Sequence, residues 1–125
     1  MRMTMENGSD AEVLRSAELE CHLNTMNLAD NRFANLHKSN QEYIQTILTE
    51  SGFALEKRLG KASEHYVAEH FNPNPVIRYV NPWWKFWARS PTVDGFELAD
   101  IIYVFVAFLE ETPEPKSIRW KRLNL

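Results

Sequence analysis

Apolar residues recur at helical spacing in the first part of the chain, and this pattern predicts two or three helices within residues 10–71. The first helix is expected over residues 10–28, with Ser9 or Asp10 as its N-terminal cap. Its apolar side is formed by Val13, Leu14, Ala17, Cys21 and Met26. Residues 1–9 are polar and are expected to be a disordered tail.

The second predicted helix starts at a capping box, in which Ser39 and Glu42 each satisfy a backbone N–H of the other. Its apolar positions are Tyr43, Ile44, Ile47 and Leu48, and it should end near Gly52. A third helix is expected over residues 53–71, because Leu55, Leu59, Ala62, Tyr66 and Val67 share one face. The Asn-Pro-Asn-Pro sequence at 72–75 then stops it.

The second half of the chain is predicted to be rich in strands, over residues 76–80, 97–109 and 117–125. The middle segment carries β-branched and aromatic residues from Ile101 to Val106, which is typical of a central strand covered on both faces. The sequence therefore predicts one α+β domain over residues 1–125. Two or three N-terminal helices would pack on a small, mainly antiparallel sheet in the C-terminal half.

Charge and composition narrow the classes of function. The net charge of the 125 residues is −3, so a nucleic-acid contact would need a local basic patch rather than a global positive field. Cys21 is the single cysteine and cannot form an internal disulfide. The longest apolar run, residues 101–109, is shorter than the roughly 20 residues of a membrane helix. We expect a cytoplasmic protein without a membrane segment.

Glu97 and Asp100 carry the chemistry that the pattern suggests, because they interrupt the most apolar segment of the chain. A buried carboxylate is costly unless something pairs with it. One interpretation is that Asp100 reaches solvent, an arginine or a backbone donor. The other is that it binds Mg²⁺ or Mn²⁺, which prefer oxygen ligands and can activate water for phosphodiester hydrolysis.

The segment from Asp94 to Ile102, with a helix before it and a hairpin after it, resembles the PD-(D/E)xK superfamily of restriction-endonuclease-like nucleases. The resemblance implies that Asp100 is a metal ligand, that Glu97 belongs to the catalytic site, and that Glu64 or Glu69 adds a carboxylate from the preceding helix. DNA would be the substrate. Its phosphates would contact the basic residues Lys85, Arg89, Lys121 and Arg122.

The family's acid-x-lysine element is missing from its expected place. A hairpin turn near Pro113 would pair Asp100 with a position about one residue beyond Leu125. We therefore expect the chain as given to be an inactive relic, a weak nuclease or the leading part of a longer one.

A tryptophan-rich segment at residues 83–89 offers an alternative function. Its aromatic and basic side chains could close the core, anchor a protein partner or stack on the bases of nucleic acid. The residues concerned are Trp83, Trp84, Lys85, Trp87 and Arg89. The second hypothesis is thus a non-enzymatic interaction module, such as an accessory, inhibitor or immunity-type protein, with homo-oligomer formation left open.

Overall fold

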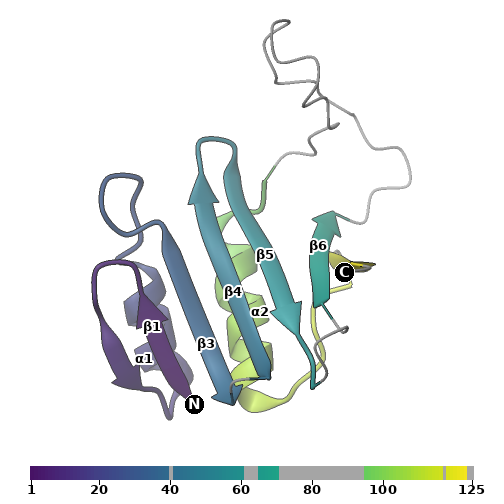
Figure 1. Cartoon of the computed structure of the whole chain (residues 1–125), viewed down its shortest axis with the longest axis horizontal. Coiled ribbons are helices and arrows are strands. Elements are labelled where there is room, and N and C mark those ends of the chain that lie inside the picture. Colours follow the sequence, from purple (N-terminus) through teal and green to yellow (C-terminus); the bar gives the residue numbers. More distant parts are fainter. Residues whose placement is uncertain (40, 61–64, 71–94, 117, 124–125) are drawn as a thin grey trace, which may run out of the picture.

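The computed structural model describes residues 1–39, 41–60, 65–70, 95–116 and 118–123, which form a seven-stranded antiparallel sheet and two helices (Figure 1). The order of strands across the sheet is β2-β1-β3-β4-β5-β6-β7. The strands are β1 (Arg2–Met5), β2 (Asp10–Glu12), β3 (Phe33–Ser39), β4 (Glu42–Thr49), β5 (Gly52–Arg58), β6 (His65–His70) and β7 (Ile118–Leu123). The helices are α1 (Ser16–Leu23) and α2 (Leu98–Glu110).

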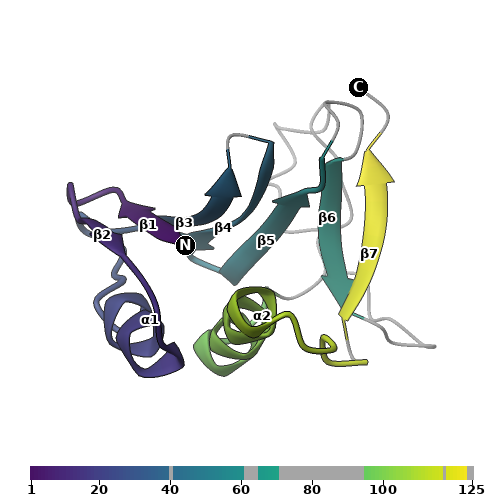
Figure 2. The same ribbon diagram turned by 90° about the horizontal axis from the view of Figure 1, so that it is seen from below.

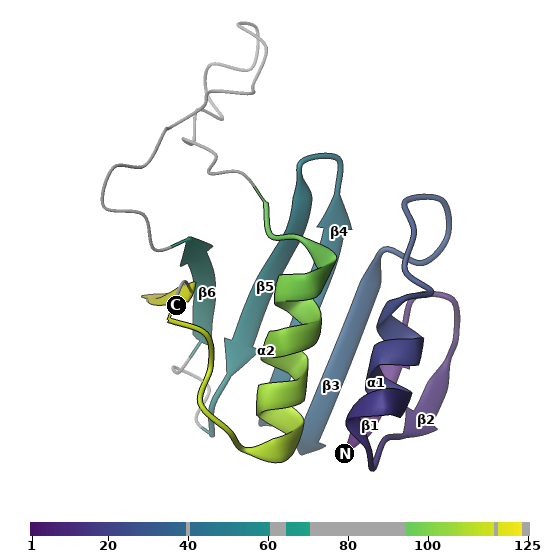
Figure 3. The ribbon, with the colours of Figure 1, turned by 180° about the vertical axis from the view of Figure 1, so that it is seen from behind.

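Both helices lie on the same face of the sheet, and α2 runs alongside the central strands (Figures 2 and 3). The sheet is bent, so that β6 and β7 stand steeply relative to β1 and α2 lies within the bend (Figure 2). We call the opposite face the open face, because no helix of the described residues covers it.

Alternation of inward and outward residues explains the central strands. In β4, Ile44 and Thr46 point to the helices and are almost fully buried, whereas the intervening Gln45 is half-buried on the open face. The register carries this alternation across the sheet, because Ile44 pairs with Leu36 of β3 and Thr46 pairs with Leu55 of β5. Inward residues of neighbouring strands therefore meet under the helices.

The predicted N-terminal helical layer is wrong. Of the predicted helix over residues 10–28, only α1 is helical, while Asp10–Glu12 forms β2. The predicted tail contains β1, which pairs with β2 and β3. The two further predicted helices are replaced by the three antiparallel strands β4, β5 and β6.

The predicted turns of those helices are hairpin turns. Ser39 pairs with Glu42 at the end of the β3–β4 hairpin, and the Ser39 hydroxyl accepts the N–H of Gln41 at 3.3 Å. Gly52 starts β5 with φ of 121° instead of ending a helix. Serine and glycine favour hairpin turns as well as helix ends, so these residues did not discriminate between the two.

The predicted central strand over residues 97–109 is also wrong, because this segment is the helix α2. Ile101, Phe105 and Phe108 recur at helical spacing and are 0%, 0% and 9% exposed. They pack on the inward face of the sheet. If this segment were a strand of the sheet, it could not cover that face. The predicted strand over 117–125 contains β7, and the predicted strand over 76–80 lies outside the described residues.

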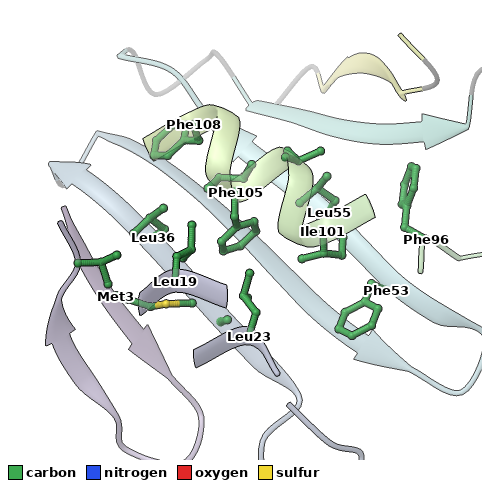
Figure 4. Close-up of a cluster of buried hydrophobic side chains, with 14 of the residues drawn as sticks. Met3, Leu19, Leu23, Leu36, Phe53, Leu55, Phe96, Ile101, Phe105 and Phe108 are labelled. Atoms are coloured by element: carbon green, nitrogen blue, oxygen red, sulfur yellow. The ribbon is translucent and has the colours of Figure 1, made fainter. Parts of the chain in front are cut away.

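The core lies between the helices and the sheet (Figure 4). Phe105 projects from α2 into this space, where Leu19 and Leu23 of α1 and Leu36 of β3 are also fully buried. At the other end of α2, Phe53 and Phe96 are 8% and 4% exposed. The two helices thus share one apolar core with the strands.

The start of α2 is pinned to the β4–β5 hairpin by backbone contacts. Phe53 and Phe96 form an isolated antiparallel bridge with two N–H···O bonds of 2.9 Å, and the N–H of Gly95 donates to the carbonyl of Ser51 at 3.0 Å. A Cβ on Gly52 would lie 2.9 Å from the Cα of Gly95. Two glycines therefore let the backbones approach at this crossing.

The end of α2 is held by Lys38, at the end of β3. Its Nζ lies 2.9 Å from Glu111 Oε1 and 3.5 Å from Glu42 Oε1, and 4.9 Å from the centre of the Phe108 ring. The hydrogen bond from Lys38 lowers the pKa of Glu111, and that contact with Glu111 also raises the pKa of Lys38. One lysine thus connects the β3–β4 hairpin to the helix.

The lowered pKa of Glu111 predicts a stability difference that depends on pH. The folded protein favours the charged carboxylate, so its stabilising effect is present above the ordinary glutamate pKa and is lost as the pH falls through the folded-state pKa. Glu111→Gln should therefore lower the melting temperature slightly near neutral pH, and the two proteins should converge as the pH falls below the folded-state pKa of Glu111.

Glu110→Gln is the matched control, because Glu110 has no ion pair among the described residues. Its melting temperature should differ little from wild type at either pH. A Glu111→Gln effect that persisted unchanged in acid would contradict the role of the Lys38 ion pair.

Candidate functional site

Asp100 lies in the first turn of α2 and not in a strand. Its Oδ2 accepts the backbone N–H of Glu97 at 3.0 Å, which is the backward bond of a capping box. A carboxylate is also favoured here by the helix dipole. The helix start therefore provides the compensation for which a metal ion was one candidate.

The other predicted carboxylates do not join Asp100. Glu69 lies on β6 with its side chain on the open face, across from Arg119 of β7, whereas α2 covers the other face of the sheet. Glu64 lies outside the described residues. Among the residues that the structure does describe, no group of three or more His, Cys, Asp or Glu side chains is placed to hold a metal ion.

The predicted nucleic-acid contacts are only partly described. Trp83, Trp84, Lys85, Trp87 and Arg89 lie outside the described residues. Lys121 and Arg122 are exposed on the edge strand β7 and point to opposite faces of the sheet. Exposed Lys and Arg on an edge strand discourage pairing with another strand, so their presence has a structural explanation.

The segment that contains α2 is strongly acidic. Residues 95–115 carry five carboxylates and no lysine or arginine, although the whole chain has a net charge of only −3. The five are Glu97, Asp100, Glu110, Glu111 and Glu114. A local negative field therefore surrounds the helix, while β7 and Lys116, two residues before it, are basic.

Glu114 belongs to a cluster that fastens the segment between α2 and β7. Lys57 Nζ lies 3.3 Å from Glu114 Oε1, 4.0 Å from the centre of the Trp120 ring and 5.6 Å from that of Tyr66. The indole N–H of Trp120 donates to the other Glu114 oxygen. The cation, the carboxylate and the indole satisfy one another, which makes this cluster structural.

The side of α2 that bears Tyr103 is also apolar, and Ile102 and Val106 on this side also pack partly against the core. Tyr103 is 55% exposed, and Ile102 and Val106 are half-buried beside it. Together with neighbouring residues they line a cavity of about 410 Å³, which we call the α2 groove. Its lining residues are Ala99, Ile102, Tyr103, Val106, Ala107, Glu110 and Thr112.

Sequence reasoning missed this groove because it treated residues 97–109 as a strand. The spacing of Ala99, Ile102, Tyr103 and Val106 is that of one helix face. This face lies on the other side of the helix from the buried face of Ile101, Phe105 and Phe108. The capping-box pattern could have indicated the helix. Glu97 and Asp100 are three residues apart and stand just before the apolar run, which is typical of a helix start.

Comparisons with known proteins assign no family to this chain. No family model matches it, and no match is found among curated proteins or solved structures. None of the helices in the described part of the chain combines the length and the apolar content that crossing a membrane requires.

Proposed function

We propose that this protein is a non-enzymatic interaction module that binds an apolar segment of a partner protein, flanked by basic residues, in the α2 groove. The observation that carries the proposal is the second apolar face of α2, with Tyr103 exposed at its centre. A helix that is apolar all round normally lies inside a larger assembly. A contiguous exposed apolar patch is the usual mark of a protein interface.

The placement of Asp100 favours this function over metal-dependent hydrolysis. The nuclease hypothesis was based on an acid within a buried strand, and Asp100 instead accepts a backbone N–H at a helix start. The negative charge of Asp100 is therefore compensated by the helix start, without a cation.

Charge specifies the chemistry of the partner. Glu110 lines the groove near the end of α2 and makes no ion pair among the described residues, while Glu97 and Asp100 lie at the beginning of the helix. Carboxylates thus occur at both ends of an apolar surface. A partner with apolar anchors and flanking lysine or arginine would complement both features, and its association should weaken with salt.

The α2 groove can be tested with two short fluorescent peptides. One is an amphipathic peptide of leucine and lysine with helical spacing, and the other replaces every lysine with glutamate. We expect the lysine peptide to bind and the glutamate peptide to bind much more weakly, as measured by fluorescence anisotropy. Tyr103→Glu should weaken the lysine peptide by about tenfold or more, because it places a charge at the centre of the apolar surface.

Leu14→Glu is the matched control, because Leu14 is 75% exposed and does not line the groove. Both variants add one carboxylate, so a purely electrostatic attraction to the lysine peptide would not weaken in either. Equal binding of the two peptides, or unchanged binding to Tyr103→Glu, would overturn the proposal.

A further inference from the structure

A row of polar and aromatic side chains crosses the open face of the sheet. His37 of β3 pairs with Tyr43 of β4, Tyr43 pairs with Arg58 of β5, and Arg58 pairs with His65 of β6. Because directly paired residues point to the same face, these four side chains project together, away from the helices. Figure 1 views this face, on which β3, β4, β5 and β6 lie side by side.

Three members of this row have unused hydrogen-bonding capacity. The side chains of Tyr43, Arg58 and His65 are half-buried and make no hydrogen bond or ion pair with the described residues. The Nε–H of Arg58 is buried and lacks an acceptor among the described residues. A buried donor without a partner is costly, so an acceptor that reaches Arg58 would stabilise the folded protein.

The neighbouring acids do not neutralise this row. Glu56 is the carboxylate of the adjacent row, two residues before Arg58 on the same face, and it accepts the amide of Gln45 at 2.7 Å. Arg2, at the β1 end of the row, is already paired with Asp10 at 2.6 Å. Arg58 is therefore the half-buried cation at the middle of the row without a counter-ion among the described residues.

We propose that Tyr43, Arg58 and His65 form a binding site for a phosphate group on the open face. The guanidinium provides a planar fork of donors that matches phosphate, and the tyrosine hydroxyl and the imidazole add donors from the strands on either side. Adjacent strands are about 4.8 Å apart, so three neighbouring side chains can converge on the three oxygens of one phosphoryl group. The site is separate from the α2 groove, which lies on the other side of the sheet.

Two sources could supply the phosphate, namely a free phosphate ion and a nucleotide. Inorganic phosphate, adenosine monophosphate and acetate are titrated into the full chain, and binding is followed by NMR through the Arg58 Nε–H and the His65 ring signals. We expect phosphate and adenosine monophosphate to shift both signals and acetate to bind at least tenfold more weakly. Tighter binding of adenosine monophosphate than of phosphate would identify the nucleotide as the source and equal binding the free ion.

Arg58→Gln should weaken phosphate binding at least tenfold, and Arg58→Lys, which keeps the charge and loses the fork, should be intermediate. Arg119→Gln is the control, because Arg119 is an exposed cation of the same face placed across from Glu69, and it should change the affinity less than twofold. Unchanged binding in Arg58→Gln, an equal loss in Arg119→Gln, or acetate binding as tightly as phosphate would overturn the site. If Arg58→Gln does not fold, Arg58→Lys and a His65→Ala variant provide the same comparison.

Discussion

Replacement of Phe105 by alanine is expected to lower the free energy of unfolding by about 3–5 kcal/mol, which is the usual cost of truncating a fully buried phenylalanine. The ring is 0% exposed and lies where α2 meets α1 and the sheet (Figure 4). Because Leu19 and Leu23 of α1 and Leu36 of β3 surround the same space, the cavity cannot be filled by moving one element alone. Urea unfolding followed by circular dichroism measures the loss.

Tyr103→Ala is the control on the same helix. Tyr103 is 55% exposed and lies on the outward face, so its truncation should cost about 1 kcal/mol or less. Both substitutions place alanine in α2, and helix propensity therefore contributes little to the difference. A Phe105→Ala protein as stable as Tyr103→Ala would show that Phe105 is not the centre of the core.

Alanine at Gly52 should be the second large effect, at about 3 kcal/mol or more. Gly52 has φ of 121°, a conformation that side chains rarely adopt, and its new Cβ would lie 2.9 Å from Gly95 Cα and 3.0 Å from the carbonyl oxygen of Phe96. The obstacles are backbone atoms and cannot rotate away. Relief requires separating the β4–β5 hairpin from the start of α2, which would break the Phe53–Phe96 bridge.

Gly8→Ala isolates the conformational part of this cost. Gly8 also has a positive φ, 91°, but a Cβ there would meet no atom within 4 Å. We expect a loss of about 1–2 kcal/mol, the strain of a left-handed residue alone. The difference between the two variants in urea unfolding then measures the close approach at Gly52, and equal losses would contradict it.

The strands β4 and β5 could not be recognised from apolar spacing alone. Tyr43, Ile44, Ile47 and Leu48 fit one side of a helix, but in the strand Ile44 and Leu48 point inward while Tyr43 and Ile47 point to the open face. Ile47 remains 41% exposed, so an apolar residue at an outward position hid the strand alternation. The face that each residue occupies is set by the helices that cover the sheet, and this is tertiary information.

The helix α2 illustrates the opposite error. Its β-branched and aromatic residues, from Ile101 to Phe105, favour a strand on local preference. Burial of Ile101, Phe105 and Phe108 against the sheet overrides that preference, because the apolar area buried outweighs small differences in propensity. The sequence indicates that Glu97 and Asp100 interrupt the apolar segment, and the group that pairs with Asp100 is the helix's own backbone.

The candidate sites were beyond reach of the sequence for a related reason. Tyr43, Arg58 and His65 become neighbours only through the register of β4, β5 and β6, which were predicted as helices. Likewise, Tyr103 defines a groove only when α2 presents a second apolar face. Local patterns indicate which residues are unusual, and long-range pairing decides which of them meet.

The strand order also has a consequence for how the chain folds. From β3 to β6 each strand pairs with the next one in the sequence. These hairpins therefore close over short stretches of chain, and the loss of entropy on loop closure is small. The pairing of β6 with β7 instead joins His70 to Ile118, with α2 between them in the sequence. We therefore expect the consecutive strands β3 to β6 to form early and β7 to be the last strand added. Docking of β7 should then be the step that limits the folding rate.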